Sequence, residues 1–349
     1  DEIDYRKPEG YDRKERREPF NGEDMRKEQP AVERTASEDH ERQAQSKKFK
    51  NLLIKNEEAI HKSRQESIKS LGLNKYIAEL EMNGYTVVPP SVTGVSIAEI
   101  DHLTDLLLKK SEELIGCPFS VESGPEAELD YGDYPGTLEL MSGVKPAQFQ
   151  LMQLCTFDRA FRDLAINPVA IALMEYLIQP ESTRFSSHNC FVKWKGDGYG
   201  ESLGLHCDQA GVPLPWGRIS LNANTNWCLT EYTLENGPLA VVPGSHHRNS
   251  HPVMPGATEE AIPIECPKGS LIAFHGQLWH GAYPKTSDGL RITISNYYRH
   301  ASISPQDDIP NHFPKELAED CSDPDTFRRL AGFGTPYQSQ VLPVPKAIK

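Results

Sequence analysis

The sequence has 349 residues, of which 38% are apolar and 25% are charged, and its formal net charge is −13. This length and composition fit one large globular domain or two small ones. No stretch approaches the roughly 18 consecutive apolar residues that a membrane-spanning helix needs, so such a helix is excluded.

Charge is distributed unevenly along the chain. Residues 1–70 contain 17 basic and 17 acidic side chains, so the whole excess of negative charge lies in residues 71–349. A surface this acidic repels a phosphate backbone, which argues against DNA or RNA as a partner. The seven cysteines are scattered and never spaced C-x-x-C. This usage is typical of reduced thiols, and we expect a cytoplasmic protein.

The first 70 residues form a charged segment. Half of them are charged, and only ten of the first 50 are apolar, too few to offset the entropy cost of ordering. We expect 1–70 to be a largely disordered or extended N-terminal arm, mobile up to about residue 45. A roughly helical apolar pattern over 47–68 leaves open a surface helix, a partner-binding segment or a solvated extension without a role in chemistry.

A folded domain is predicted from residue 71 to 320, and it begins with helices. A helix over 75–82 is expected to end at the C-cap residues Asn83 and Gly84, and a strand follows over 85–88. Ser96 is expected to cap a helix that runs to about residue 115.

Two irregular features follow these helices. Residues 118–146 are rich in Gly, Pro and acidic residues, which predicts a long loop of the kind that often binds ligands. A helical region over 158–178 is interrupted at Pro168, where Asn167 is expected to start the second half.

From Thr183 onward the pattern changes to short strands separated by turn signals. The predicted strands span residues 184–194, 202–208, 218–231, 238–242, 262–266, 270–275 and 290–299. The expected fold class is therefore mainly β with flanking helices, a sandwich or jelly roll. Residues 321–349 are expected to be a C-terminal extension.

Three polar side chains in this region have the pattern of a metal site. Alternation within LGLHCD (203–208) places His206 and Asp208 on one face of a strand. His280 stands at the exit of the apolar strand that begins near residue 270. Two histidines and one carboxylate with open positions are the facial triad of non-haem Fe(II) oxygenases. Arg291, eleven residues past His280, offers a two-pronged clamp for a dicarboxylate co-substrate.

These motifs resemble those of the phytanoyl-CoA dioxygenase family. The shared features are H-x-D, the turn NGPL (236–239) leading to VPGSH (242–246), and FH…LWHG (274–281) followed by Arg291. The resemblance spans about residues 75–300. It implies a double-stranded β-helix, a cupin-like jelly roll, that uses Fe(II), 2-oxoglutarate and O₂.

The resemblance also implies roles for individual residues. It makes His206, Asp208 and His280 the iron ligands and Arg291 the group that grips the distal carboxylate of 2-oxoglutarate. Relatives that halogenate lack the metal carboxylate, so Asp208 favours hydroxylation or a related oxidation. Relatives often carry a hydroxyl two residues after the second metal histidine, where this chain has Ala282. Thr293 is a candidate to supply that contact.

Further candidate cofactor contacts lie on two strands. Asn222, Asn224 and Asn226 alternate with apolar residues and share a face with Cys228. Two interpretations are open for these asparagines. They either line a pocket, where a polar co-substrate would satisfy their amide groups, or form a polar stripe that faces solvent. Relatives place a polar contact to the C1 carboxylate of 2-oxoglutarate on the strand before H-x-D, where His188, Asn189, Lys193 and Lys195 lie and Asn189 is the first choice.

The remaining histidines and tryptophans receive simpler interpretations. His246, His247 and His275 are expected to pack in turns or behind the ligands rather than to bind metal. Trp216 and Trp279 flank the ligand motifs, and they wall the substrate pocket or pack in the core.

The sequence thus predicts an oxidoreductase, a 2-oxoglutarate-dependent Fe(II) dioxygenase that oxidises a small organic substrate. Two alternatives stay open. One is a cupin-type metalloenzyme that does not use 2-oxoglutarate, in which Arg291 would have no function. The other is a non-catalytic metal- or ligand-binding domain on the same fold, with the charged arm as its partner site.

Overall fold

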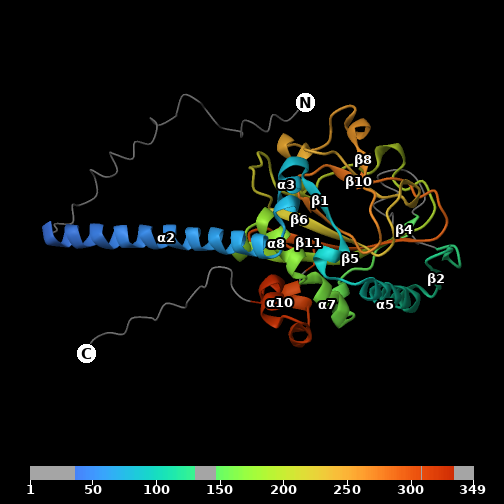
Figure 1. Cartoon of the computed structure of the whole chain (residues 1–349), viewed down its shortest axis with the longest axis horizontal. Coiled ribbons are helices and arrows are strands. Elements are labelled where there is room, and N and C mark those ends of the chain that lie inside the picture. Colours follow the sequence, from blue (N-terminus) through green and yellow to red (C-terminus); the bar gives the residue numbers. More distant parts are fainter. Residues whose placement is uncertain (1–35, 130–146, 308, 334–349) are drawn as a thin grey trace, which may run out of the picture. The chain divides into compact units, whose positions relative to one another are not determined.

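A computed structural model of the chain describes residues 36–129, 147–307 and 309–333. The chain divides into two compact units, residues 1–59 and 60–349. Helix α2 (Ala36–Ser70) is the long blue helix in Figure 1. None of the described helices combines the length and the apolar character needed to cross a membrane.

Helix α2 lies within the charged arm, so residues 36–46 are helical where a disordered or extended segment was expected, and over 47–68 the helix that the sequence left open as an alternative is formed. The physical reason lies in the residue types, since Glu, Lys, Gln, Arg and Ala have high intrinsic helix propensity. Lys62 and Glu66 also form an (i, i+4) pair at 3.8 Å. Ile68, near the end of the helix, is buried in the main hydrophobic core.

The helices before the sheet form largely as the sequence predicts. They are α3 (Asn74–Asn83), α4 (Pro90–Thr93), α5 (Ile97–Ile115), α7 (Arg159–Ala165) and α8 (Pro168–Leu177). Ser96 and Glu99 form a reciprocal capping box at the start of α5. Asn167 caps α8, and Pro168 occupies its first turn, where a missing N–H costs nothing.

The strands form a six-stranded antiparallel sheet and a smaller three-stranded one. The large sheet has the order β1 (Tyr85–Val88), β9 (Leu271–His275), β6 (Asn222–Cys228), β11 (Arg291–His300), β5 (Thr183–Lys193) and β4 (Gln148–Phe149). The small sheet has the order β10 (His280–Ala282), β7 (Leu239–Val241) and β8 (Ile262–Pro263). The predicted fold class, mainly β with flanking helices in a jelly-roll arrangement, is confirmed.

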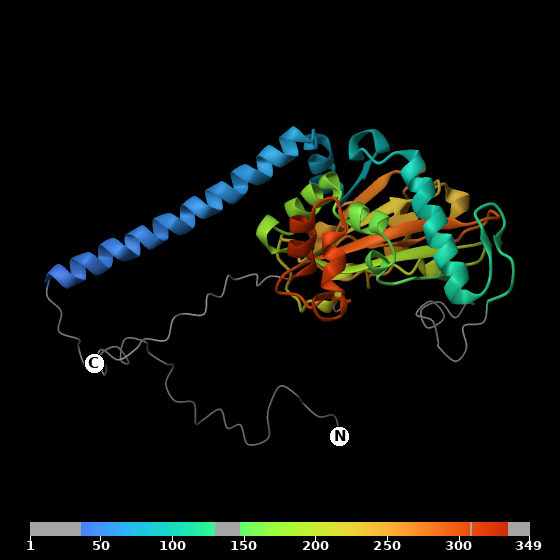
Figure 2. The same ribbon diagram turned by 90° about the horizontal axis from the view of Figure 1, so that it is seen from below.

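The helices cover one face of the large sheet. Helix α8 contacts β6 and β9, α3 contacts β1, and α10 (Pro324–Ala331) contacts β5. In Figure 2 the teal helix α5 crosses in front of the strands. The main core joins apolar residues of these helices to the sheet. The other face of the large sheet is therefore left to form a cavity with the small sheet.

Three predicted elements differ from the structure. The strand expected over 202–208 is replaced by two 3-10 turns, Gly200–Ser202 and Asp208–Gly211. Leu203 and Gly204 have positive φ values of 53° and 60°, which interrupt an extended strand. The strands expected over 218–231 and 262–266 are shorter, since β6 begins at Asn222 and β8 ends at Pro263.

The predicted loop and the C-terminal segment are described in part. Before residue 130 the predicted loop contains the small hairpin of β2 (Phe119–Ser120) and β3 (Gly124–Pro125), and residues 130–146 lie outside the described ranges. In the predicted C-terminal extension, α10 begins at the Asp323 cap and buries Phe327 and Leu330. This part of the extension belongs to the folded core.

Candidate metal centre

Three potential metal ligands converge where the two sheets meet. One ligand atom from each of His206, Asp208 and His280 lies within 4.8 Å of the others, and no other such group occurs among the described residues. His206 Nε2 is 3.6 Å from one oxygen of Asp208, and His280 Nε2 is 3.6 Å from the other. Two imidazoles and one carboxylate at these separations can share one divalent ion while leaving open positions.

Backbone carbonyls orient both imidazole rings. The Nδ1 atom of His206 lies 2.7 Å from the Gly204 carbonyl, and that of His280 lies 3.0 Å from the Leu278 carbonyl. A carbonyl only accepts, so each Nδ1 carries the proton and each Nε2 keeps a free lone pair toward Asp208. These hydrogen bonds therefore assign the Nδ1-protonated tautomer to both histidines.

The two histidines meet through their backbones, although one lies on β10 and the other lies in an irregular loop. The N–H of each donates to the carbonyl of the other, at 2.9 and 2.8 Å. Gly281 permits this approach, because a Cβ at that position would lie 2.1 Å from the Leu203 carbonyl oxygen. The close backbone contact thus requires the glycine that follows the metal-site histidine.

Asp208 is held by side chains from β6 and β11. The Asn224 amide donates to its carboxylate, and the Tyr297 hydroxyl donates to its backbone carbonyl at 3.2 Å. Burial raises the pKa of Asp208, but His280, His206 and Asn224 together outweigh it and hold the pKa below its usual value. Asp208 is therefore an anion fixed in orientation, as a metal ligand must be.

Arg291 lies deep in the same cavity without a carboxylate partner among the described residues. It is 5% exposed, and its Nη1 donates to Thr293 Oγ1 at 2.8 Å and to the Tyr232 hydroxyl at 3.2 Å. Its Nε has no hydrogen-bond partner in the described part of the chain. A buried guanidinium without a counter-charge is costly, so the site is suited to an anionic ligand.

Two further buried lysines lie near Arg291 but do not line the cavity. Lys193 lies opposite Arg291 in the β5–β11 ladder, and Lys285 donates to Asn236, Ser287 and the Asp288 carbonyl. Burial and the neighbouring Arg291 lower the pKa of both lysines, which disfavours their charged forms. The preference of the cavity for an anionic group therefore rests on Arg291.

The other predicted cofactor residues fall into two groups. Asn189, Asn224 and Asn226 line the cavity, and the side-chain oxygen of each has no described hydrogen-bond partner. Thr293 instead holds Arg291 and Tyr232. Asn222 bonds to Tyr297, and Cys228 packs in a core cluster.

The other polar candidates near Asn189 do not line the cavity. His188 contacts the Cys155 sulfur at 2.6 Å on the other face of the sheet, and Lys195 pairs with the exposed Asp288 at 3.1 Å. Of the four candidates on this strand, Asn189 is the one that reaches the cavity.

The cavity has a volume of about 590 Å³, within the usual range for small-molecule sites. Aromatic side chains that sequence reasoning missed form much of its wall: Phe191, Tyr199, Tyr232, Phe274 and Tyr297. Strand alternation could have found Phe191 and Tyr297, which lie two residues from Asn189 and Ser295. Tyr232 follows a turn and had no such signal.

The structure also distinguishes between the interpretations given to the tryptophans and the remaining histidines. Trp216 and Trp279 pack together in an apolar cluster, and each indole N–H donates to a backbone carbonyl at 2.7 Å. Neither lines the cavity, so core packing is the correct interpretation. His246, His247 and His275 lie outside the cavity and are not part of the metal site.

Two curated relatives match part of the chain. A dioxygenase, af480, of Aspergillus fumigatus is 31% identical over 180 residues, which cover 51% of this chain and 57% of the relative. An uncharacterized protein, Mb1539, of Mycobacterium bovis is 26% identical over 229 residues, which cover 64% and 74%. The chain thus spans little more than half the length of af480.

Two solved structures are similar in part. The non-haem α-ketoglutarate-dependent epimerase SnoN of nogalamycin biosynthesis gives a TM-score of 0.46 at 19% identity, covering 70% of this chain and 92% of its own. HygX of Streptomyces hygroscopicus, with nickel and 2-oxoglutarate bound, gives a TM-score of 0.48 at 13% identity, covering 66% and 88%.

The comparison with protein families is the most informative. The family model described as phytanoyl-CoA dioxygenase matches residues 80–293, which is more than half of the chain. The matched range contains the three candidate metal ligands and Arg291, and it confirms the resemblance stated from the sequence motifs. The chain belongs to the phytanoyl-CoA dioxygenase family.

Proposed function

We propose that this protein is a non-haem Fe(II)- and 2-oxoglutarate-dependent dioxygenase that hydroxylates, or otherwise oxidises, a small organic substrate. The reaction would use O₂ and release succinate and CO₂. The observation that carries the proposal is the pairing of a two-histidine, one-carboxylate group with a buried arginine for which the described residues supply no counter-charge.

The donor set fits Fe(II). Both imidazoles present Nε2 toward Asp208, and neither Nε2 donates to a carbonyl. Three protein ligands on one side leave room for a bidentate co-substrate and O₂. When bound, iron would supply the activation of O₂ that no protein side chain provides.

The residues of this chain would position the reactants. Asn224 holds the Asp208 carboxylate in place, and Arg291 would bind the distal carboxylate of 2-oxoglutarate through its guanidinium. Tyr232 and Thr293 fix that guanidinium from the side away from its free Nε. The amide of Asn189 is the proposed contact for the C1 carboxylate, because it lines the cavity with an unpaired oxygen.

Asp208 bears on which reaction is catalysed, and the aromatic wall of the cavity bears on which substrates fit. An intact metal carboxylate occupies the position that a halide would need, which favours hydroxylation or a related oxidation over halogenation. Phe191 and Phe274 line the cavity beside the ligands, and they would hold an apolar substrate body and exclude water. A cytoplasmic location and the absence of nucleic-acid partners stay predictions.

The experiment is an assay of succinate release from 2-oxoglutarate with Fe(II) and O₂, with and without candidate substrates. Asp208→Gly removes one metal ligand, so we expect succinate release to fall roughly 100-fold or more. Asp288→Asn is the matched control, because Asp288 is an exposed carboxylate paired with Lys195. It should leave the rate unchanged.

Two results would favour the alternatives. Fe(II) binding with no binding of 2-oxoglutarate to the Fe(II)-loaded protein, measured by calorimetry under anaerobic conditions, would indicate a cupin-type metalloenzyme. Full succinate release by the Asp208→Gly variant, or no metal binding at all, would contradict the oxygenase proposal and favour a non-catalytic binding domain.

A further inference from the structure

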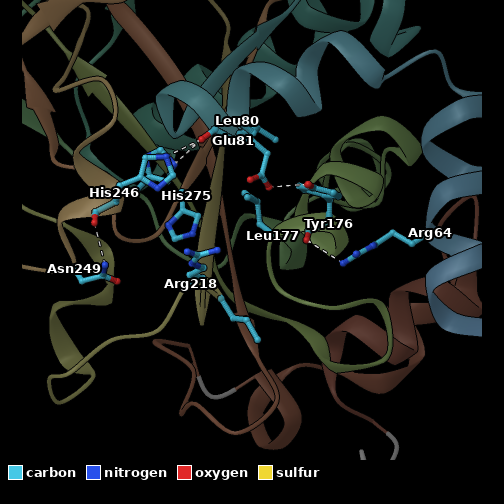
Figure 3. A pocket seen from close by; sticks show the side chains of 11 residues that line it. Arg64, Leu80, Glu81, Tyr176, Leu177, Arg218, His246, Asn249 and His275 are labelled. Atoms are coloured by element: carbon cyan, nitrogen blue, oxygen red, sulfur yellow. Dashed lines mark hydrogen bonds between the residues drawn. The ribbon is translucent and has the colours of Figure 1, made fainter. Parts of the chain in front are cut away.

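A second cavity lies on the helix-covered face of the large sheet. Its volume is about 570 Å³, and none of its lining residues also lines the metal-side cavity. Successive residues of a strand point to opposite faces, so Phe274 of β9 faces the metal side and His275 faces this cavity. Figure 3 shows His275 and Arg218 on one side of Leu177, and Arg64 on the other.

Two arginines give this cavity its charge. Within the described ranges, neither Arg64 nor Arg218 forms an ion pair, although many of the chain's other arginines do. The Arg64 guanidinium lies 5.1 Å above the ring of Tyr176 and makes a long contact of 3.5 Å to that residue's carbonyl. Arg218 is exposed, with its backbone bonded to His275. Both guanidinium groups keep donors free for a ligand.

The cavity wall contains one carboxylate, that of Glu81, and this group already has a partner. It accepts a hydrogen bond from the Tyr176 hydroxyl at 2.7 Å. The imidazoles of His246 and His247 both contact the Glu81 backbone carbonyl, at 3.2 and 2.9 Å. Burial lowers the pKa of His246 to about 4, so its ring is neutral near pH 7. The two arginines supply the positive charge and outnumber the single Glu81 carboxylate among the lining residues.

This arrangement excludes two classes of ligand. A cation would be repelled by both guanidinium groups. A fully apolar molecule would cover them without offering any hydrogen-bond acceptor. A guanidinium matches the geometry of phosphate and carboxylate groups, which accept two parallel hydrogen bonds. Leu177 and the Tyr176 ring add an apolar surface beside these groups.

We propose that this cavity binds a small organic anion, whose phosphate or carboxylate group is attracted by the two arginines that line it, Arg64 and Arg218, and whose body packs against Leu177 and Tyr176. This site is separate from the proposed oxygenase reaction and does not depend on it. The volume of the cavity leaves room for an organic body in addition to the anionic group.

The loops beside this cavity also carry metal-site residues. Arg218 follows Asp208 by ten residues, and His275 precedes His280 by five. The two loops are linked where Gln209 N–H donates to the Gly276 carbonyl at 2.8 Å and the Gln277 amide donates to the Gly217 carbonyl at 2.9 Å. Because activity could respond to changes in either cavity, the test measures binding directly.

The experiment is titration calorimetry of the full-length chain with phenyl phosphate, inorganic phosphate and benzoate. We expect phenyl phosphate to bind several-fold more tightly than inorganic phosphate, because the ring adds contacts with Tyr176 and Leu177. Comparison with benzoate shows whether a phosphate or a carboxylate is preferred. Arg218→Gln and Arg64→Gln should each weaken binding of the preferred probe about tenfold or more.

Two control variants locate the site. Arg159→Gln removes an exposed arginine that is ion-paired with Asp163, and it should bind the probe as the wild type does. Arg291→Gln removes the arginine of the metal-side cavity and should also bind normally. Circular dichroism would verify that every variant is folded.

The proposal fails if the wild type binds none of the three probes. It also fails if Arg64→Gln and Arg218→Gln bind as tightly as Arg159→Gln does, which would indicate non-specific attraction. Loss of binding in Arg291→Gln alone would place the anion in the metal-side cavity instead.

Discussion

The two faces of the large sheet carry cavities of similar size that are built from different groups. The metal-side cavity, about 590 Å³, joins one carboxylate ligand and two imidazoles to a buried arginine and an aromatic wall. The helix-side cavity, about 570 Å³, joins two arginines, which form no ion pair within the described residues, to the neutral imidazoles of His246 and His275. In the first, hydrogen bonds hold Asp208 and one side of Arg291, while three asparagine oxygens and the Arg291 Nε have no described partner; in the second, Arg64 makes only long contacts to the Tyr176 carbonyl and His61. The comparison shows that a single strand, β9, can supply adjacent residues to two unrelated sites.

The largest effect on stability is expected from a substitution that forces apart the backbone segments beside the candidate metal site. Gly281→Ala would place a Cβ 2.1 Å from the Leu203 carbonyl oxygen, and the backbone must move apart to accommodate it. We expect a loss of about 3 kcal/mol in the free energy of unfolding, measured by urea denaturation, and weaker Fe(II) binding.

Gly211→Ala is the matched control for that change. A Cβ at Gly211 meets no atom within 4 Å, so stability and metal binding should stay near those of the wild type. Equal behaviour of the two variants would show that the close approach of His206 and His280 does not depend on Gly281.

Acid should destabilise the protein through histidines that the sheet buries on its helix side. Burial lowers the pKa of His188 from its usual 6.5 to about 3. The unfolded chain therefore binds a proton near pH 6.5 while the folded chain resists it. The stability from this residue is complete above about pH 6.5 and is lost as the pH falls toward 3.

At pH 5 this loss corresponds to about 2 kcal/mol. His188→Gln should remove that part of the difference between the free energies of unfolding at pH 7 and pH 5, measured by denaturant titration. His246 and His275 have lowered pKa values as well, so some pH dependence should remain. An unchanged difference between the two pH values would show that His188 is not held neutral.

Arg291→Lys separates the roles of the arginines on the two faces. Lysine keeps the charge but lacks the planar fork that matches a carboxylate, so the KM for 2-oxoglutarate should rise at least about tenfold. Arg218→Lys, on the other face, should leave that KM unchanged. An unaltered KM in Arg291→Lys would remove Arg291 from the co-substrate site.

The smallest effect is expected from the charged arm. Deletion of residues 1–45 should change iron binding and turnover by less than about twofold, because the segment has little apolar surface to contribute to a core. Its effect on the melting temperature should be equally small. A large drop in melting temperature would show that the arm packs against the folded domain.

Local features of the fold could be predicted because they depend on neighbouring residues. The Ser96 capping box and the Asn167–Pro168 helix start follow from side chains one to three positions away. The strands of the large sheet follow from alternation and turn signals. The strand predicted over 202–208 was wrong. The sequence alternates as a strand does, but positive φ values at Leu203 and Gly204 turn the backbone.

The sequence by itself determined the residue types of the metal site and their order. It indicated His206, Asp208, His280 and Arg291, because a triad of this chemistry with a following arginine is rare by chance and matches a family. It could not show how Asp208 is oriented, since Asn224 and Tyr297 reach it from distant strands.

Tertiary structure alone decided the rest. Tyr232 holds Arg291 from 59 residues away, and Arg64, Arg218 and His275 meet at one cavity from three separate parts of the chain. The physical reason is that such contacts depend on how strands pair and helices cover the sheet, which no local pattern specifies. The candidate metal ligands could be inferred because they lie in short sequence motifs. The second cavity could not be predicted, because its lining residues come together only in the tertiary structure.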